Sequence, residues 1–259
     1  MEKEILRAEH ISKAYGDKEI LKDIDFSLEE RELVCLLGVS GVGKTTLFNI
    51  LSGLTKPDSG SVKLKDSQGE FRDITGKNGE LSYMLQKDLL LPHMHVIDNV
   101  ALPLTLGGMS KQKAREVASE HFKRFGLEGT QFKYPSQLSG GMRQRAALLR
   151  TYLCGNRVAL LDEPFSALDT ITRSSMQEWF LEVMDELKMS TIFITHDIDE
   201  AILISDRIYI MSGSPASLTK EFRIDRPKPR NQAFTLTEEF LEYKKEIRRL
   251  LFADQIAFS

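Results

Sequence analysis

A glycine-rich run that ends in a lysine and a threonine is the clearest chemical signal in this sequence. Gly38-Val39-Ser40-Gly41-Val42-Gly43-Lys44-Thr45 matches the pattern G-x-x-x-x-G-K-[ST] at every fixed position. In such a loop, backbone N–H groups converge on phosphate oxygens, and the lysine reaches the β and γ phosphates. The threonine hydroxyl can coordinate Mg²⁺. The run therefore predicts a site for ATP and Mg²⁺.

The residues on either side of this run fit a strand, a loop and a helix. Residues 33–37 are all apolar, as in a buried strand, and apolar residues at positions 47, 48, 50 and 51 indicate a helix packed on a sheet. The alternative, a glycine-rich turn before an unrelated helix, would make the lysine–threonine pair a coincidence. The residues expected to bind ATP here are Gly38, Val39, Ser40, Gly41, Val42, Gly43, Lys44, Thr45 and Thr46.

Two adjacent carboxylates follow a second apolar strand. Residues 158–161 are apolar, and Asp162 and Glu163 come next. In parallel sheets, ligands bind at the carboxyl ends of the strands. We predict that Asp162 helps to hold Mg²⁺ and that Glu163 is the general base for an attacking water. The alternative is a pair of solvated loop acids, which the long apolar strand and the upstream phosphate loop disfavour.

Two further polar residues end predicted strands. His196 follows residues 191–195 and is predicted to hydrogen-bond the γ-phosphate and the catalytic water, although a lone histidine at a strand end is usually structural. Gln86 follows residues 81–85 and is predicted to contact Mg²⁺ and to link the phosphate state to movement of the next segment. For Gln86 the alternative is a polar strand cap. The remaining histidines show no metal-ligand spacing and are expected to be structural or at an interface: His10, His93, His95 and His121.

A second phosphate-binding signal lies at residues 139–145. Ser139 is a good N-cap, Gly140 and Gly141 allow close backbone approach, and a helix is predicted over residues 142–153. The loop at residues 38–45 already holds the nucleotide of this chain. We therefore predict that Ser139, Gly140 and Gly141 complete the site of a second subunit related by a two-fold axis. An ordinary capped helix is the alternative.

Composition narrows the class of protein. The chain has 259 residues, 41% of them hydrophobic, and a net charge of −3. This charge provides no basic field for nucleic acid, so no nucleic-acid partner is expected. Cys35 and Cys154 have no disulfide or zinc spacing and are expected to be buried in a reducing compartment. No apolar signal region or run of about 18 residues occurs, so we expect a cytosolic protein that meets the membrane through a partner.

The predicted elements describe an α/β fold. Strands are expected at residues 5–11, 24–28, 33–37, 61–64 and 81–85, and again at 158–161, 191–195 and 207–211. We predict a P-loop NTPase core with a mixed or parallel sheet, an N-terminal antiparallel β subdomain, and a helical insert over about residues 90–155. The core would span residues 1–230. Residues 231–259 would form a C-terminal helical extension whose basic face is either solvated or docked on the core as a regulatory tail.

The motifs together resemble those of ATP-binding cassette (ABC) ATPases of membrane transporters. Residues 138–145 resemble the family signature, residues 160–164 its acidic strand, and residues 166–169 its subunit-contact loop, which implies a dimer contact at Asp169. Gln86 resembles the lid glutamine and His196 the switch histidine. Tyr15 matches the aromatic residue that stacks on adenine. The resemblance implies Glu163, His196, Gln86 and Lys44 as catalytic residues. Met142 departs from the Gln or Glu that many members carry.

The resemblance also implies partners and a location. ATP would close two cassettes, an identical pair being the expectation and a paralogue the open alternative. Separate transmembrane permease subunits and an extracytoplasmic solute-binding protein would complete an importer, with this chain at the cytoplasmic face of the membrane. Residues 90–104 and 222–230 are similar to the nitrate, sulfonate and taurine branch, which also handles bicarbonate and thiamine or pyrimidine precursors. The sequence alone names neither the solute nor the direction of transport.

Other classes of P-loop protein remain as alternatives. DNA-repair members of the family carry a long coiled coil between the phosphate loop and the signature, and translation factors join two cassettes in one chain. This sequence has room only for a short helical insert and contains one cassette. A small-molecule kinase would leave residues 139–145 and His196 unexplained.

Overall fold

The computed structural model describes residues 3–166, 168–228 and 230–251. Ala167 of the predicted subunit-contact loop, Pro229 of the linker, and residues 252–259 of the predicted C-terminal extension lie outside these described residues.

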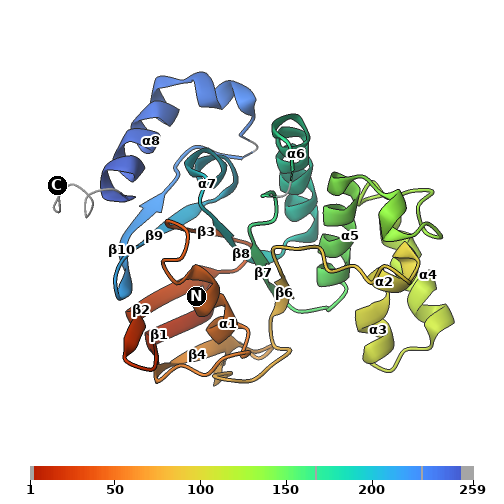
Figure 1. The fold of residues 1–259 in the computed structure, drawn as a ribbon, viewed down its shortest axis with the longest axis horizontal. Coiled ribbons are helices and arrows are strands. Elements are labelled where there is room, and N and C mark those ends of the chain that lie inside the picture. The colour runs from red at the N-terminus through yellow and green to blue at the C-terminus, as the bar shows by residue number, and fades with distance from the viewer. Residues whose placement is uncertain (1–2, 167, 229, 252–259) are drawn as a thin grey trace.

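A single mixed sheet of ten strands runs through the described part of the chain, in the order β5-β4-β1-β2-β10-β9-β3-β8-β7-β6 (Figure 1). The strands are β1 (Glu4–Tyr15), β2 (Lys18–Glu29), β3 (Leu33–Leu37), β4 (Ser59–Lys65), β5 (Phe71–Asp73), β6 (Ser82–Met84), β7 (Val158–Asp162), β8 (Ser190–Thr195), β9 (Arg207–Gly213) and β10 (Ala216–Arg223).

Five neighbouring strands form the parallel half of this sheet. β3 pairs in parallel with both β8 and β9, β7 pairs with β8, and β6 pairs with β7. Carboxyl ends of parallel strands meet at one edge of a sheet. The segments that follow β3, β6, β7 and β8 therefore come together, and these segments carry the predicted chemistry.

The antiparallel half is continuous with the parallel half. β1 and β2 form a long hairpin, β4 pairs with β1, and β10 pairs with β9 and meets β2 at Ala216 and Leu21. The predicted strands at residues 5–11 and 24–28 were too short. His10 and Asp23 have φ of +54° and +49°, and the register shifts between Ala8 and Ile11. Such bulges interrupt the alternation of apolar and polar residues from which strand length was predicted.

Both faces of the central strand β3 are covered. Leu33, Cys35 and Leu37 belong to a buried cluster with the helices α5 (Gly140–Tyr152), α6 (Thr170–Leu187) and α7 (Ile198–Ile204). Val34 and Leu36 belong to a second cluster with α1 (Lys44–Leu51) and the β1–β2 hairpin. All five residues are buried, as a parallel strand covered on both faces requires. The predicted fold class is confirmed.

The helices fall into three groups: those of the core, those of the helical insert between residues 96 and 152, and the C-terminal helix. Those of the helical insert lie to one side of the sheet, and the C-terminal helix lies beyond α7 (Figure 1). The helices are α1 (Lys44–Leu51), α2 (Val96–Val100), α3 (Leu102–Leu106), α4 (Lys111–Phe122), α5 (Gly140–Tyr152), α6 (Thr170–Leu187), α7 (Ile198–Ile204) and α8 (Glu238–Leu251), with short 3₁₀ turns at Pro135–Gln137 and Gln232–Leu236. Among the described residues, none of the helices combines the length and the apolar character needed to cross a bilayer.

The two cysteines differ in environment. Cys35 is fully buried in β3, as predicted, and its thiol is free. The prediction that Cys154 is buried was wrong, because this residue is exposed in the turn after α5. Helix α5 ends at Tyr152 with Leu153 as its C-cap, so the burial pattern of the helix no longer applies at position 154.

Candidate active site

A cleft of about 670 Å³ lies at the carboxyl edge of the parallel strands. It collects most of the predicted site residues from five separate segments: Tyr15, Ser40, Gly41, Gly43, Lys44, Thr45, Thr46, Gln86, Asp162, Glu163 and His196. Val39 and Val42 line a smaller adjoining cavity together with Ser40 and Gly41. The fold thus brings residues that are up to 181 positions apart, Tyr15 and His196, to one surface.

The lysine of the phosphate loop, Lys44, is buried. Lys44 is only 5% exposed, and its Nζ donates to the carbonyl oxygens of Gly38 (2.7 Å) and Val39 (2.9 Å). Burial lowers the pKa of Lys44, while the carboxylates of Glu163 and Asp162 oppose that shift. Gly38 leaves no room for a side chain, since a Cβ there would lie 2.6 Å from the carbonyl oxygen of Met211.

Asp162 lies beside the first turn of α1. Its Oδ2 accepts hydrogen bonds from Thr45 Oγ1 and from the Tyr83 hydroxyl, both at 3.4 Å. Burial, followed by the charge of Glu163, raises the pKa of Asp162. Oxygen donors such as Thr45, Asp162 and Gln86 suit Mg²⁺, and a dication would offset the unfavourable charge of this buried carboxylate. The residues present therefore fit the predicted metal ion.

Glu163 is held from two sides. Its Oε2 accepts from Gln86 Nε2 at 2.9 Å, and its Oε1 lies 3.0 Å from His196 Nδ1. The backbone φ of Glu163 is +46°, a left-handed conformation that residues other than glycine seldom adopt. Its backbone N–H donates to the Ile194 carbonyl at the end of β8. The carboxylate is consequently fixed between the ends of β6 and β8.

The end of the cleft where Tyr15 is predicted to stack on adenine is formed by the β1–β2 hairpin. Tyr15 ends β1 and is 52% exposed, so about half of the residue is accessible to a ligand in the cleft. Lys13 Nζ lies 5.5 Å from the centre of this ring. Ile20, across the hairpin turn, also lines the cleft.

The second phosphate signal lies apart from the cleft. Ser139 is the N-cap of α5 and accepts from the backbone N–H of Met142 at 3.3 Å. Asp169 is the N-cap of α6 and accepts from Thr172 N at 3.1 Å. Gly141 packs against the same helix, where a Cβ would lie 3.3 Å from Thr172 Cγ2. Ser139, Gly140, Gly141 and Asp169, all described residues, do not line the cleft of their own chain.

Sequence reasoning missed several residues in the cleft or beside it. The Tyr83 hydroxyl donates a hydrogen bond to Asp162, and Ile20 and Ile194 line the wall of the cleft. The position of Tyr83 in the strand before Gln86 was visible, but its contact depends on the pairing of β6 with β7. The absence of metal-ligand spacing around His10 in the sequence also left out residues that the fold brings close to it. Its ring lies with the carboxylates of Asp23 and Asp25 in one exposed group, brought together by the hairpin.

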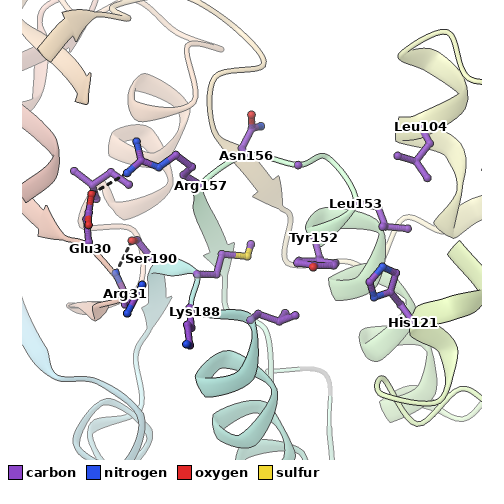
Figure 2. Close-up of a pocket in the computed structure, with 14 residues that line it drawn as sticks. Glu30, Arg31, Leu104, His121, Tyr152, Leu153, Asn156, Arg157, Lys188 and Ser190 are labelled. Carbon is purple, nitrogen blue, oxygen red and sulfur yellow. Dashed lines mark hydrogen bonds and ion pairs between the residues drawn. The ribbon is translucent and has the colours of Figure 1, made fainter. Parts of the chain in front are cut away.

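A second cavity, of about 540 Å³, lies at the amino ends of β3, β7 and β8, away from the predicted chemistry (Figure 2). On the core side, Glu30 pairs with Arg157 at 2.8 Å, and the Arg31 backbone N–H donates to Ser190 Oγ. His121 lines the opposite wall, which belongs to the helical insert. This cavity shares no residue with the cleft at the carboxyl edge.

Comparison with known proteins gives concordant matches. The family model described as ABC transporter matches residues 21–166. The formylaminopyrimidine import ATP-binding protein ThiZ of Halalkalibacterium halodurans is 38% identical, over 99% of this chain and 100% of its own length. The nitrate import ATP-binding protein NrtD of Synechocystis sp. is 35% identical, over 91% and 89%. The taurine import ATP-binding protein TauB of Escherichia coli O157:H7 is 34% identical, over 98% and 100%.

Solved structures agree with these sequence matches. A dimeric post-hydrolysis state of the ATP-binding cassette MJ0796 bound to ADP and Pi is similar with a TM-score of 0.71 and 27% identity, over 86% of this chain and 100% of that chain. The structure of cbiO1 from Clostridium perfringens, part of the transporter complex cbiONQ, gives a TM-score of 0.77 over 98% and 100%. Its 24% identity supports the fold alone.

Proposed function

We propose a mechanism for this chain on the premise that it belongs to the ABC transporter family as an ATP-hydrolysing subunit of the import type. In this mechanism, two copies close over two ATP molecules and drive solute import through separate permease subunits. The observation that carries the site assignment is Glu163, held between Gln86 and His196 within the cleft that also contains Lys44.

Binding of ATP begins with the phosphate loop. The ammonium of Lys44 exchanges its two carbonyl acceptors, Gly38 and Val39, for oxygens of the β and γ phosphates. Tyr15 stacks on the adenine. Thr45, Asp162 and Gln86 would hold Mg²⁺, which when bound neutralises charge on the phosphates. These contacts place the γ-phosphate beside Glu163.

Hydrolysis then needs one proton acceptor. Glu163 accepts a proton from the attacking water while the water oxygen forms a bond to the γ-phosphorus and the bond from that phosphorus to the bridging oxygen breaks. ADP and phosphate are the products. His196 hydrogen-bonds the γ-phosphate and orients the water. Gln86 links loss of the γ-phosphate to movement of the helical insert. It contacts Glu163, and it starts the segment that leads to the insert.

The signature residues act on the partner's nucleotide. Ser139, Gly140 and Gly141 present a capped helix N-terminus that lies outside the cleft of their own chain, and Asp169 lies at the start of the adjacent helix. In a two-fold dimer these residues close the site of the opposite subunit. Residues of one composite site therefore come from two chains.

Mixing inactive variants tests this arrangement. Lys44→Ala destroys the phosphate loop of its own chain, and Ser139→Arg blocks the signature. A heterodimer of the two has one intact composite site, so an equimolar mixture should recover about a quarter of wild-type turnover by random pairing. The matched control mixes Lys44→Ala with Glu163→Gln, which leaves no intact site and should recover nothing. Equal turnover in the two mixtures would contradict a site shared between chains.

The membrane partner is proposed to dock on the segment after Gln86. In this segment Leu89 is 52% exposed. Leu85, just before Gln86, is 40% exposed, and Leu106 at the end of α3 is 80% exposed. A peripheral position at the cytoplasmic face of the membrane, with a permease and an extracytoplasmic solute-binding protein, follows from this arrangement. Co-purification tests it: a multi-span membrane protein should be recovered with the tagged chain, and Leu89→Asp should release it. Recovery of ribosomes or DNA instead would support a non-transport ABC ATPase.

The solute is proposed to be of the formylaminopyrimidine, nitrate or taurine type. The formylaminopyrimidine class is the first to test, because the relative that imports it shares 38% identity over 99% of this chain. The decisive measurement is calorimetric titration of the co-purified solute-binding protein with each compound. Binding of none of the three would remove this assignment and leave the ATPase role intact.

A further inference from the structure

His196 is fixed in place by the helix that follows it. Asp197 is the N-cap of α7, and its Oδ1 accepts from the backbone N–H groups of Asp199 (2.9 Å) and Glu200 (3.2 Å). The backbone N–H of Asp197 donates to Thr195 Oγ1 at the end of β8 (3.0 Å). His196 thus lies in the short connection between β8 and α7, so the position of its imidazole depends on that of α7.

Arg230 holds the far end of α7. It is 4% exposed, and its guanidinium donates to the carbonyl oxygens of Ile202 (2.9 Å) and Ser205 (2.5 Å). It also donates to Ile224 O (3.1 Å) and Arg226 O (2.8 Å) in the segment after β10. The last carbonyls of a helix lack donors within the helix. Arg230 supplies such donors and joins this end of α7 to the C-terminal segment.

Lys244 holds the near end of α7. Its Nζ lies 2.6 Å from Oδ1 and 2.8 Å from Oδ2 of Asp199, in the first turn of α7. α8, which carries Lys244, contacts α7 and β9 and lies beside α7 in the ribbon (Figure 1). Its residues Phe240 and Ile247 are buried in the same hydrophobic cluster as Ala201, Ile202, Leu203 and Ile204. The C-terminal segment therefore contacts α7 along its length.

We propose that residues 230–251 form a brace that positions His196 through α7, with Arg230 and Lys244 as positioning residues. The proposal rests on the proposed role of His196 and extends it to the C-terminal segment. Loss of the brace leaves ATP binding intact, because Lys44 and Tyr15 are carried by other elements. It lowers turnover, because His196 then spends less time against Glu163 and the γ-phosphate.

Lys244→Met in the full-length chain tests the brace without opening the core. Hydrogen exchange of backbone amides in residues 198–204 should quicken by about two- to fivefold, the change expected from a partly exposed ion pair. In the same variant kcat should fall, by no more than this factor, while the KM for ATP stays unchanged. The matched control is Lys245→Met, an exposed neighbour on α8, which should change neither measurement.

His196→Ala separates positioning from general stability. If Lys244 acts through His196, adding Lys244→Met to His196→Ala should still quicken exchange in α7 but should lower turnover no further. A further fall in turnover would mean that α8 acts by another route and would overturn the proposal. So would quickened exchange with unchanged kcat in Lys244→Met alone.

Arg230→Lys provides a second, stronger perturbation. Lysine keeps the charge but cannot reach four carbonyls in the planar geometry of a guanidinium, so exchange in α7 should quicken more than in Lys244→Met, with kcat again reduced at constant KM. Unchanged exchange in both variants would contradict the brace. Wild-type turnover in His196→Ala would instead remove the role of His196 in the proposed function, and with it this inference.

Discussion

Replacement of Glu163 by glutamine tests the catalytic assignment most directly. The side chains have nearly the same shape, and the contacts of Glu163 can survive the change. The amide oxygen of glutamine can accept from Gln86 Nε2, as Glu163 does at 2.9 Å. Its amide nitrogen can donate to His196 Nδ1, now 3.0 Å from the carboxylate, when that nitrogen is unprotonated. We therefore expect the free energy of unfolding to change by about 1 kcal/mol or less.

The chemical effect should be far larger than the structural one. An amide cannot accept the proton of the attacking water. General base catalysis contributes about 10²- to 10⁴-fold, so the barrier should rise by roughly 2.7 to 5.4 kcal/mol. Binding of ATP uses Lys44 and Tyr15 and should be preserved. Because ATP then persists, the closed dimer should accumulate.

Three measurements on the purified full-length chain decide the matter. Steady-state phosphate release gives kcat, light scattering with Mg²⁺ and ATP gives the mass of the particle, and thermal unfolding checks the fold. Glu182→Gln, an exposed carboxylate on α6, is the control and should behave as wild type. Turnover of Glu163→Gln within about threefold of wild type would refute the role of Glu163 as the general base, given the 10²-fold minimum expected for one. Loss of ATP binding would show that the residue acts before the chemical step.

The remaining predictions concern charge and stacking in the same cleft. Because burial raises the pKa of Asp162 in the folded state, the stability linked to this group is present below its unfolded pKa and lost as pH rises through its folded pKa. Asp162→Asn should therefore raise the melting temperature of the nucleotide-free protein at pH 7 but not near pH 3, while abolishing Mg²⁺-dependent turnover; a lower melting temperature at pH 7 would contradict this reading. Tyr15→Ala should weaken ATP binding by about 1–3 kcal/mol and Tyr15→Phe should not, as measured by calorimetric titration. Equal affinities in the two Tyr15 variants would exclude stacking.

Local signals in the sequence identified most of the residues that gather in the cleft. The spacing of glycine, lysine and threonine at residues 38–45 is a property of one continuous loop, and the apolar run before Asp162 identifies a buried strand without reference to the rest of the fold. The α/β class and the helical insert followed from periodicities that also extend over a few residues. Such features are readable because the interactions behind them are short in sequence.

Strand length and side-chain burial at element ends were less predictable. The bulges at His10 and Asp23 concealed the true extent of the β1–β2 hairpin, and Cys154 proved exposed just past the end of α5. In both places a local pattern stops or reverses within one or two residues. The backbone geometry that causes the change depends on the partner strand or on the following turn.

Only the tertiary structure decided which side chains meet. The contacts of Glu163 with Gln86 and His196, and of Asp162 with Tyr83, depend on the pairing of β6, β7 and β8, strands that lie far apart in the sequence. Ser139, at the N-cap of α5, does not line the cleft of its own chain. The contacts of α8 with α7 depend on burial of the apolar residues Phe240 and Ile247 of α8 against residues that lie far away in the sequence. Long-range packing, rather than local propensity, therefore decides how the recognised motifs are assembled.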